Sequence, residues 1–365
     1  MTTLFEIITS VLIGYLALTD FLAVKVAEFA DSEADVVAEV IVEEEKDNLA
    51  FSNIPSIYEK GGVIPDILVK NAAYQKAATI ESELLPTTTA LYSIEEALVN
   101  ISCIYKTDEH LLKTTGTGFF VTDTGVILTN AHVATFLLLS AVPDGGESNC
   151  VIRTGDVATA AYEADLLYIS PAWVQENISE LSKAEPRGTG ERDYALLYVT
   201  DGVENTAVPT KFPYLPVDTN LLRVKEKSSN VTIGGYPAEE LLNNKDFVPR
   251  RVLASSTLAD LLTFGSSYAD VLYLSGSPVG KQGVSGGPVV NSEGVVIGLI
   301  STRGDDTELG EGSLHAITTS YIHRTMQEET GYGFRENVSG NLPYRSKIFR
   351  DTLVPFLTSL VKAEF

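Results

Sequence analysis

"GGPVVNSEGVVIGLIST", Gly286–Thr302, is the stretch that most strongly indicates the fold. β-Branched residues flank Asn-Ser-Glu-Gly, and this pattern predicts two strands joined by a tight turn, because Asn and Gly tolerate the backbone angles that such turns need. The stretch "FFVTDTGVILT", Phe119–Thr129, repeats the pattern with Asp-Thr-Gly at its turn. Both stretches therefore predict β-hairpins.

Short runs of β-branched and aromatic residues continue from about Ser93, separated by Gly, Asn and Asp. Many short strands linked by tight turns are typical of a β-sandwich or a β-barrel. Two later stretches, Thr318–Thr330 and Ser346–Phe365, have helical spacing instead, although Pro355 interrupts the second. We expect a mainly β protein with peripheral helices near its C-terminal end.

The composition excludes some classes of function. The chain has 365 residues, a net charge of -23 and a pI of about 4.5, so its average field repels nucleic acids. It contains two cysteines and four histidines, too few for a zinc-type cluster. We therefore expect no nucleic-acid partner, no metal site and no cofactor.

The N-terminal region contains an apolar run, Ile7–Thr19, bounded by Glu6 and Asp20. This run is shorter than the roughly 20 residues of a typical membrane span, so a signal segment, an interfacial helix and a core or assembly helix remain open alternatives. We expect residues 1–27 to form a hydrophobic helix that is a membrane anchor or signal. The acidic and mixed residues 28–92 are expected to be a spacer.

Ser285 lies in "GVSGGP", Gly283–Pro288, where one serine is surrounded by glycines. The glycines alone are compatible with an ordinary turn. They would also let the backbone N–H groups of Gly283 and Ser285 point at one spot beside the hydroxyl, as an oxyanion site requires. The stretch thus has two interpretations, a turn or a loop that holds a nucleophile.

Two further residues favour the nucleophile. His132 follows an apolar strand in "GVILTNAHVA", whereas His110 and His323 have the surroundings of surface histidines. Asp193 directly precedes the apolar strand of "RDYALLYV", so its carboxylate can be fixed at the entry to that strand. Taken alone, Asp193 would be read as a turn cap.

Together, the stretches around His132, Asp193 and Ser285 resemble the trypsin-like (chymotrypsin-fold) serine peptidases, and their order along the chain is the order of that class. The resemblance extends from about Ser93 to Gln327 and is strongest to the simpler bacterial type, which includes HtrA proteases. It implies two antiparallel β-barrels, and we assign residues 93–205 to the first and 206–327 to the second. Residues 328–365 are then a C-terminal tail with a helix.

The chain departs from that family in two ways. Val284 precedes the serine where the family usually has Asp or Asn, so activation by pairing of a new N-terminus with that position is not expected. The residues after Gln327 are too few for a PDZ domain, and none is expected.

The resemblance implies that Ser285 is the nucleophile, His132 the general base and Asp193 the residue that orients the imidazole, with Gly283 and Ser285 forming the oxyanion hole. Protein substrates would be cleaved through an acyl-enzyme. A small or aliphatic residue is expected before the cleaved bond, while Arg303 would instead attract an acidic one or remain an exposed charge. The residues that the resemblance places in or near the substrate pocket are Val279, Gln282, Ser301, Arg303 and His315.

The sequence is also compatible in part with two alternatives to a serine peptidase. The G-x-S-x-G pattern also occurs in α/β-hydrolase esterases, but there a helix follows the serine, and Pro288 with the hairpin after it excludes a helix. The second alternative is a catalytically idle domain of the same fold that binds peptides or assembles through its N-terminal helix. The presence of all three triad residues favours the enzyme.

Cys103 in the first expected strand and Cys150 after the stretch around His132 could form a disulfide, with two buried free thiols as the alternative. A disulfide suits an oxidising compartment, and together with the N-terminal apolar run it predicts an extracytoplasmic protein, membrane-anchored or secreted. An oligomer is compatible with the sequence.

Overall fold

A computed structural model describes residues 93–106, 111–139, 147–180, 189–204, 206–238, 247–277, 280, 282–303 and 313–362. The expected N-terminal helix, residues 1–27, and the expected spacer, residues 28–92, lie outside these ranges. None of the helices within the described ranges is long and apolar enough to cross a lipid bilayer.

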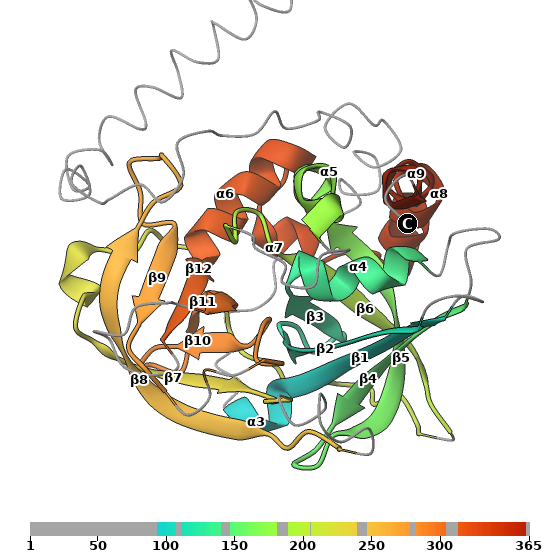
Figure 1. Ribbon diagram of the computed structural model, residues 1–365, viewed down its shortest axis with the longest axis horizontal. Coiled ribbons are helices and arrows are strands. Elements are labelled where there is room, and N and C mark those ends of the chain that lie inside the picture. The colour runs from blue at the N-terminus through green and yellow to red at the C-terminus, as the bar shows by residue number, and fades with distance from the viewer. Residues whose placement is uncertain are drawn as a thin grey trace, which may run out of the picture. The chain divides into compact units, whose positions relative to one another are not determined.

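The first barrel is a closed sheet of six antiparallel strands in the order β1-β2-β3-β6-β5-β4 (Figure 1). All six strands are consecutive in the chain, but this barrel also contains the pairings of β3 with β6 and of β1 with β4, which are not neighbours in the sequence. Its strands are β1 (Leu98–Lys106), β2 (Leu111–Phe120), β3 (Val126–Thr129), β4 (Glu147–Thr154), β5 (Thr159–Ile169) and β6 (Ala195–Gly202).

The second barrel closes in the order β10-β11-β12-β9-β8-β7 and is also antiparallel. The two barrels confirm the expected fold class. The strands of the second barrel are β7 (Asn230–Gly235), β8 (Val252–Leu262), β9 (Val271–Leu274), β10 (Pro288–Val290), β11 (Val296–Arg303) and β12 (Leu314–Thr318).

The two hairpins expected from the sequence are present. In the first, Phe119 pairs with Leu128 across the Asp-Thr-Gly turn. In the second, Pro288 pairs with Leu299, and the side chain of Asn291 accepts hydrogen bonds from two N–H groups of the turn at 3.0 Å each. Asn291 thus closes the turn with its own side chain, as such residues commonly do.

Helices flank the barrels rather than forming a layer of their own (Figure 1). Pro355 lies in the first turn of α9, where its missing N–H removes no helical hydrogen bond, so the second predicted helical stretch is divided into two helices. The α-helices are α3 (Ile94–Ala97), α4 (Ala131–Leu139), α5 (Pro171–Asn177), α6 (Thr319–Thr330), α7 (Phe334–Asn337), α8 (Leu342–Thr352) and α9 (Val354–Lys362), and η2 (Ile178–Glu180) and η3 (Val224–Glu226) are 3₁₀ turns.

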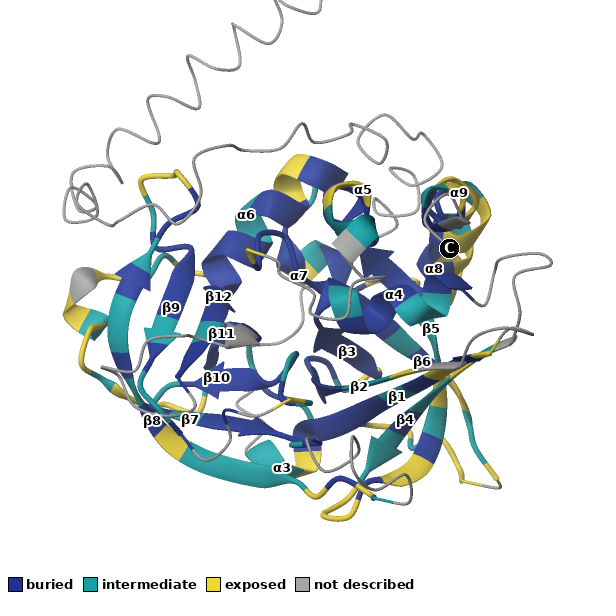
Figure 2. Cartoon of the chain, in the orientation of Figure 1, coloured by how far each residue is buried: buried dark blue, intermediate teal, exposed yellow. Residues whose placement is uncertain are grey.

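Helix α6 is buried over most of its length, where Figure 2 shows it dark blue. It begins at the N-cap Thr318, whose side chain accepts a hydrogen bond from the N–H of Tyr321. It ends at Gly331, whose φ of 80° is in the left-handed region that favours glycine. Both ends are therefore fixed by the local sequence.

Candidate active site

His132 and Asp193 are brought together by the register of two neighbouring strands. Strand β3 pairs with β6 so that Thr129 faces Ala195. His132 lies in the first turn of α4, directly after β3, and Asp193 lies directly before β6. The pairing therefore places both side chains at the same edge of the first barrel.

The carboxylate of Asp193 is held by three donors. Its Oδ1 accepts the backbone N–H of His132 at 3.0 Å, and its Oδ2 accepts from His132 Nδ1 at 2.8 Å and from Ser301 Oγ at 2.7 Å. Because an ionised carboxylate only accepts, the proton of a neutral imidazole must be on Nδ1. The lone pair of Nε2 is then free to accept a proton.

The pKa of His132 is raised above its ordinary value by this arrangement. Burial of the ring lowers the pKa, while the charge of Asp193 and the hydrogen bond to it raise the pKa by more. The His132 side chain keeps 32% of its surface exposed, whereas that of Asp193 keeps 4%. The imidazole is thus accessible from outside, and the carboxylate that supports it is not.

Ser285 belongs to the second barrel but is fixed by the first. Thr117 on β2 donates its N–H to the carbonyl of Ser285 at 2.8 Å and its hydroxyl to the carbonyl of Gly283 at 2.7 Å. The same hydroxyl accepts the N–H of Tyr236 at 2.9 Å. Thr117 therefore ties the serine loop to the barrel that carries His132 and Asp193.

The Ser285 hydroxyl donates to the carbonyl of Ser301 at 3.3 Å, and among the described residues no hydrogen bond joins it to His132. Catalytic hydrogen bonds are often long or absent until substrate binds, so this geometry is compatible with a serine that rotates toward the imidazole. Ser301 contacts both groups, through its hydroxyl to Asp193 and through its carbonyl to Ser285.

The glycines of the serine loop are required by the close packing of the barrels. Gly286 has a φ of 87°, and a Cβ added there would lie 2.0 Å from the carbonyl oxygen of Thr117. Gly283 has a φ of 92°, and a Cβ added there would lie 2.6 Å from the carbonyl oxygen of Tyr236. Within the described part of the chain, the N–H groups of Gly283 and Ser285 have no acceptor, as an oxyanion site requires.

The residues expected near the substrate pocket are only partly brought together. Gln282 is exposed beside the serine loop, and Val279 lies outside the described residues. Arg303 ends β11, where its backbone pairs with Leu314, and nothing is described of its side chain. His315 lies on β12 with its ring 4.6 Å from that of Tyr273.

Sequence reasoning missed three contacts of this site. Thr117 and Asn130 were not singled out, although Asn130 donates its side-chain amide to the carbonyl of Asp193 at 2.8 Å. Ser301 was expected at the substrate pocket, but the hydrogen bond from its hydroxyl to Asp193 was not expected. A polar residue between an apolar strand and His132 was the one signal in the sequence that indicated Asn130.

The expected pair of cysteines is joined. Cys103 on β1 faces Cys150 on β4, and the two form a disulfide between neighbouring strands of the first barrel. The pairing follows from the register, because the two residues are direct cross-strand partners.

Residues 116–299 match the family model of the trypsin-like peptidase domain. A search of curated proteins found no match. Among solved structures, the chain is similar to the active form of the Rv3671c protease from M. tuberculosis, with a TM-score of 0.40 and 18% identity over 76% of this chain and 95% of that chain.

Proposed function

Because this chain belongs to the trypsin-like peptidase family, we propose that it is a serine endopeptidase that cleaves polypeptides through an acyl-enzyme. The Ser285 oxygen attacks the carbonyl carbon of the peptide bond while His132 Nε2 takes the hydroxyl proton. Asp193 keeps the imidazole in the required tautomer and stabilises its cation. The backbone N–H groups of Gly283 and Ser285 bind the oxyanion that forms.

In the steps that follow, His132 acts first as an acid and then again as a base. His132 gives its proton to the leaving amine, and the carbon–nitrogen bond breaks to leave an ester on Ser285. A water molecule then attacks the ester with His132 as base, which releases the acid product and restores the hydroxyl.

The observation that carries this proposal is the hydrogen bond of 2.8 Å between Asp193 Oδ2 and His132 Nδ1. The Asp193 side chain is almost fully buried and has no salt bridge to Lys or Arg among the described residues. Burying a carboxylate without a Lys or Arg partner costs stability. Here the carboxylate is directed at a histidine whose other nitrogen is free. Support for a role in proton transfer comes from this combination.

The test is covalent labelling of Ser285 by a fluorophosphonate probe. Native protein should be labelled, and heat-denatured protein should not, because only the folded site activates the hydroxyl. Ser285→Ala should lose both labelling and peptidase activity, with turnover lower by about a millionfold, while its unfolding midpoint stays close to that of the wild type. Equal labelling of native and Ser285→Ala protein would refute the assignment of the nucleophile.

We also propose that the protein acts outside the cytoplasm. The disulfide between Cys103 and Cys150 supports this location, because disulfides persist in oxidising compartments. Mass spectrometry of protein alkylated without reductant, taken from its native compartment, should show neither thiol modified. Full alkylation of both would argue against the location but not against the peptidase.

A further inference from the structure

Helix α6 contacts both chain neighbours of Asp193. The hydroxyl of Tyr194 lies 2.9 Å from Thr325 Oγ1, and the Nε of Arg192 lies 3.2 Å from Glu329 Oε1. Thr325 and Glu329 are one turn apart on α6, so they lie on one face of the helix. The backbone of Asp193 is therefore held between two attachments to the same face.

Arg192 is held in a conformation that it would not adopt alone. Its φ is 53°, in the left-handed region, and such residues persist where their surroundings fix them. Its side chain is 7% exposed and forms ion pairs with Glu191 at 3.2 Å, Glu329 at 3.2 Å and Glu328 at 3.5 Å. The φ of Arg192 sets the direction in which the backbone enters Asp193, and this angle thus depends on where the guanidinium is bound.

Glu329 is the most deeply buried of these three partners, with a side chain that is 1% exposed, compared with 7% for Glu191 and 52% for Glu328. Besides its ion pair with Arg192, it accepts hydrogen bonds from the hydroxyl of Tyr168 and from Ser170 Oγ, the latter at 2.8 Å. The Tyr168 ring stacks on that of Tyr194 with centroids 5.9 Å apart. A carboxylate suits these two hydroxyl donors and the nearby guanidinium, whereas an amide in its place would direct a donor N–H at one of them.

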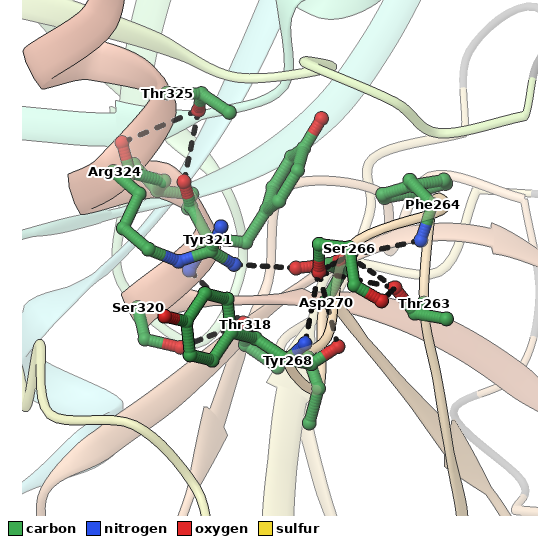
Figure 3. Close-up of polar contacts among 12 residues, drawn as sticks. Thr263, Phe264, Ser266, Tyr268, Asp270, Thr318, Ser320, Tyr321, Arg324 and Thr325 are labelled. Carbon is green, nitrogen blue, oxygen red and sulfur yellow. Dashed lines mark hydrogen bonds and ion pairs between the residues drawn. The ribbon is translucent and has the colours of Figure 1, made fainter. Parts of the chain in front are cut away.

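Helix α6 is also attached to the second barrel, through Arg324 in its middle and through Thr318 at its start (Figure 3). Arg324 pairs with Asp270, which is fully buried and also accepts from Thr263 Oγ1 at 2.8 Å and from Ser266 Oγ at 2.7 Å. The Asp270 carbonyl accepts the N–H of Thr318 at the helix start. A change at Glu329 therefore acts locally and does not release the helix as a whole.

We propose that Glu329 is a positioning residue for the catalytic site, which fixes the carboxylate of Asp193 against His132 by binding Arg192. The inference rests on the proposed function, since it assigns Asp193 its role in the triad. It concerns a residue that touches neither the substrate nor the reacting atoms.

The experiment compares Glu329→Gln with Asp270→Asn in the full-length protein. Both changes turn a buried carboxylate that is paired with an arginine into an amide, but only Glu329 contacts a neighbour of Asp193. Three quantities are measured for each: kcat and KM on a peptide substrate, the His132 pKa by NMR titration of its imidazole, and the unfolding midpoint.

Glu329→Gln should lower kcat by roughly tenfold to a hundredfold with KM unchanged, because a small displacement of catalytic groups has effects of this size. The His132 pKa should fall toward its ordinary value, since the charge of Asp193 would be less well placed. Asp270→Asn should lower the unfolding midpoint and leave kcat and the His132 pKa as in the wild type.

Arg192→Gly tests the route of the effect, because glycine adopts the positive φ without strain and lacks the guanidinium. In this background, Glu329→Gln should change kcat no further. A second full loss of kcat would show that Glu329 does not act through Arg192.

A Glu329→Gln protein with wild-type kcat and His132 pKa, and a midpoint lowered as in Asp270→Asn, would reduce Glu329 to a structural role. If the wild type is neither active nor labelled at Ser285, the proposed function fails instead. The NMR titration still decides the inference in that case, because it does not need turnover.

Discussion

His132 must be neutral to accept the proton of Ser285, so activity should depend on pH through its pKa. Asp193 raises this pKa above the ordinary value of 6.5. We therefore expect kcat/KM to be constant at high pH and to fall tenfold per unit below an apparent pKa that lies above 6.5. A pH profile on a peptide substrate measures it, and a profile that rises as the pH falls would contradict the role of base.

The Asp193→Asn substitution removes the negative charge of this side chain and keeps its shape, so it tests the effect of the charge on activity. The amide keeps the volume but lets the imidazole take the wrong tautomer, and related enzymes lose about 10⁴ in kcat by this change. We expect a loss of that order here, with the disulfide and the unfolding midpoint little changed. A loss below tenfold would mean that another group orients His132.

Glu329 should make stability depend on pH. Burial raises its pKa to about 7 from the ordinary 4.5, although Tyr168, Arg192 and Ser170 counteract part of the rise. Between these values the folded protein binds a proton that the unfolded chain has released, so the contribution is complete below pH 4.5 and is lost as the pH rises through 7. The loss is about 3 kcal/mol.

Denaturant unfolding of the wild type and of Glu329→Gln, between pH 4.5 and 8, measures this contribution. Glu191, whose pKa burial also raises to about 7, is present in both proteins and cancels from the difference. The wild type should lose more stability than the variant as the pH rises. Parallel curves for the two proteins would show that Glu329 titrates normally.

At the scale of elements, two glycines with positive φ differ in the space around them. Gly286 has no room for a Cβ, whereas at Gly294, with a φ of 78°, nothing lies within 4 Å of that position. Gly294→Ala should cost about 1 to 2 kcal/mol from the backbone alone. Gly286→Ala should cost several kcal/mol and abolish labelling of Ser285, because Thr117 and the serine loop must separate.

Unfolding free energies and fluorophosphonate labelling of the two variants check this expectation together. Equal effects of the two changes would indicate that the barrels tolerate movement of the serine loop.

The elements that could be predicted from the sequence are those whose cause is local. The turns at Gly125 and Gly294 and the start of β6 after Asp193 depend on residues a few positions apart, so their patterns are visible in the chain. The proposed triad could be recognised for the same reason, since each member lies in a short motif. The contacts of Arg192 with α6 could not be found in this way, because they join residues more than a hundred positions apart and have no local pattern.

At the scale of the whole molecule, the role of residues 1–92 stays a prediction. If the apolar run near the N-terminus anchors the enzyme, removing residues 1–92 should give a soluble protein with unchanged kcat/KM, because the described barrels and helices begin at Ser93. The full-length protein should partition into membranes. Light scattering and membrane fractionation of both forms check this, and a full-length protein that is freely soluble and oligomeric would favour an assembly helix.

The placement of α6 after both barrels also has a consequence for the order of events during synthesis. The contact between Tyr194 and Thr325 cannot form until Thr325 has left the ribosome. Synthesis of the 131 residues that separate the two takes roughly ten seconds at ordinary rates of translation. Ser285 emerges before α6, so a growing chain for a time contains all three triad residues without the helix that holds the neighbours of Asp193. A nascent chain in this interval would be a poor peptidase, and its own unfolded segments and nearby nascent proteins would be exposed to little cleavage until α6 is in place.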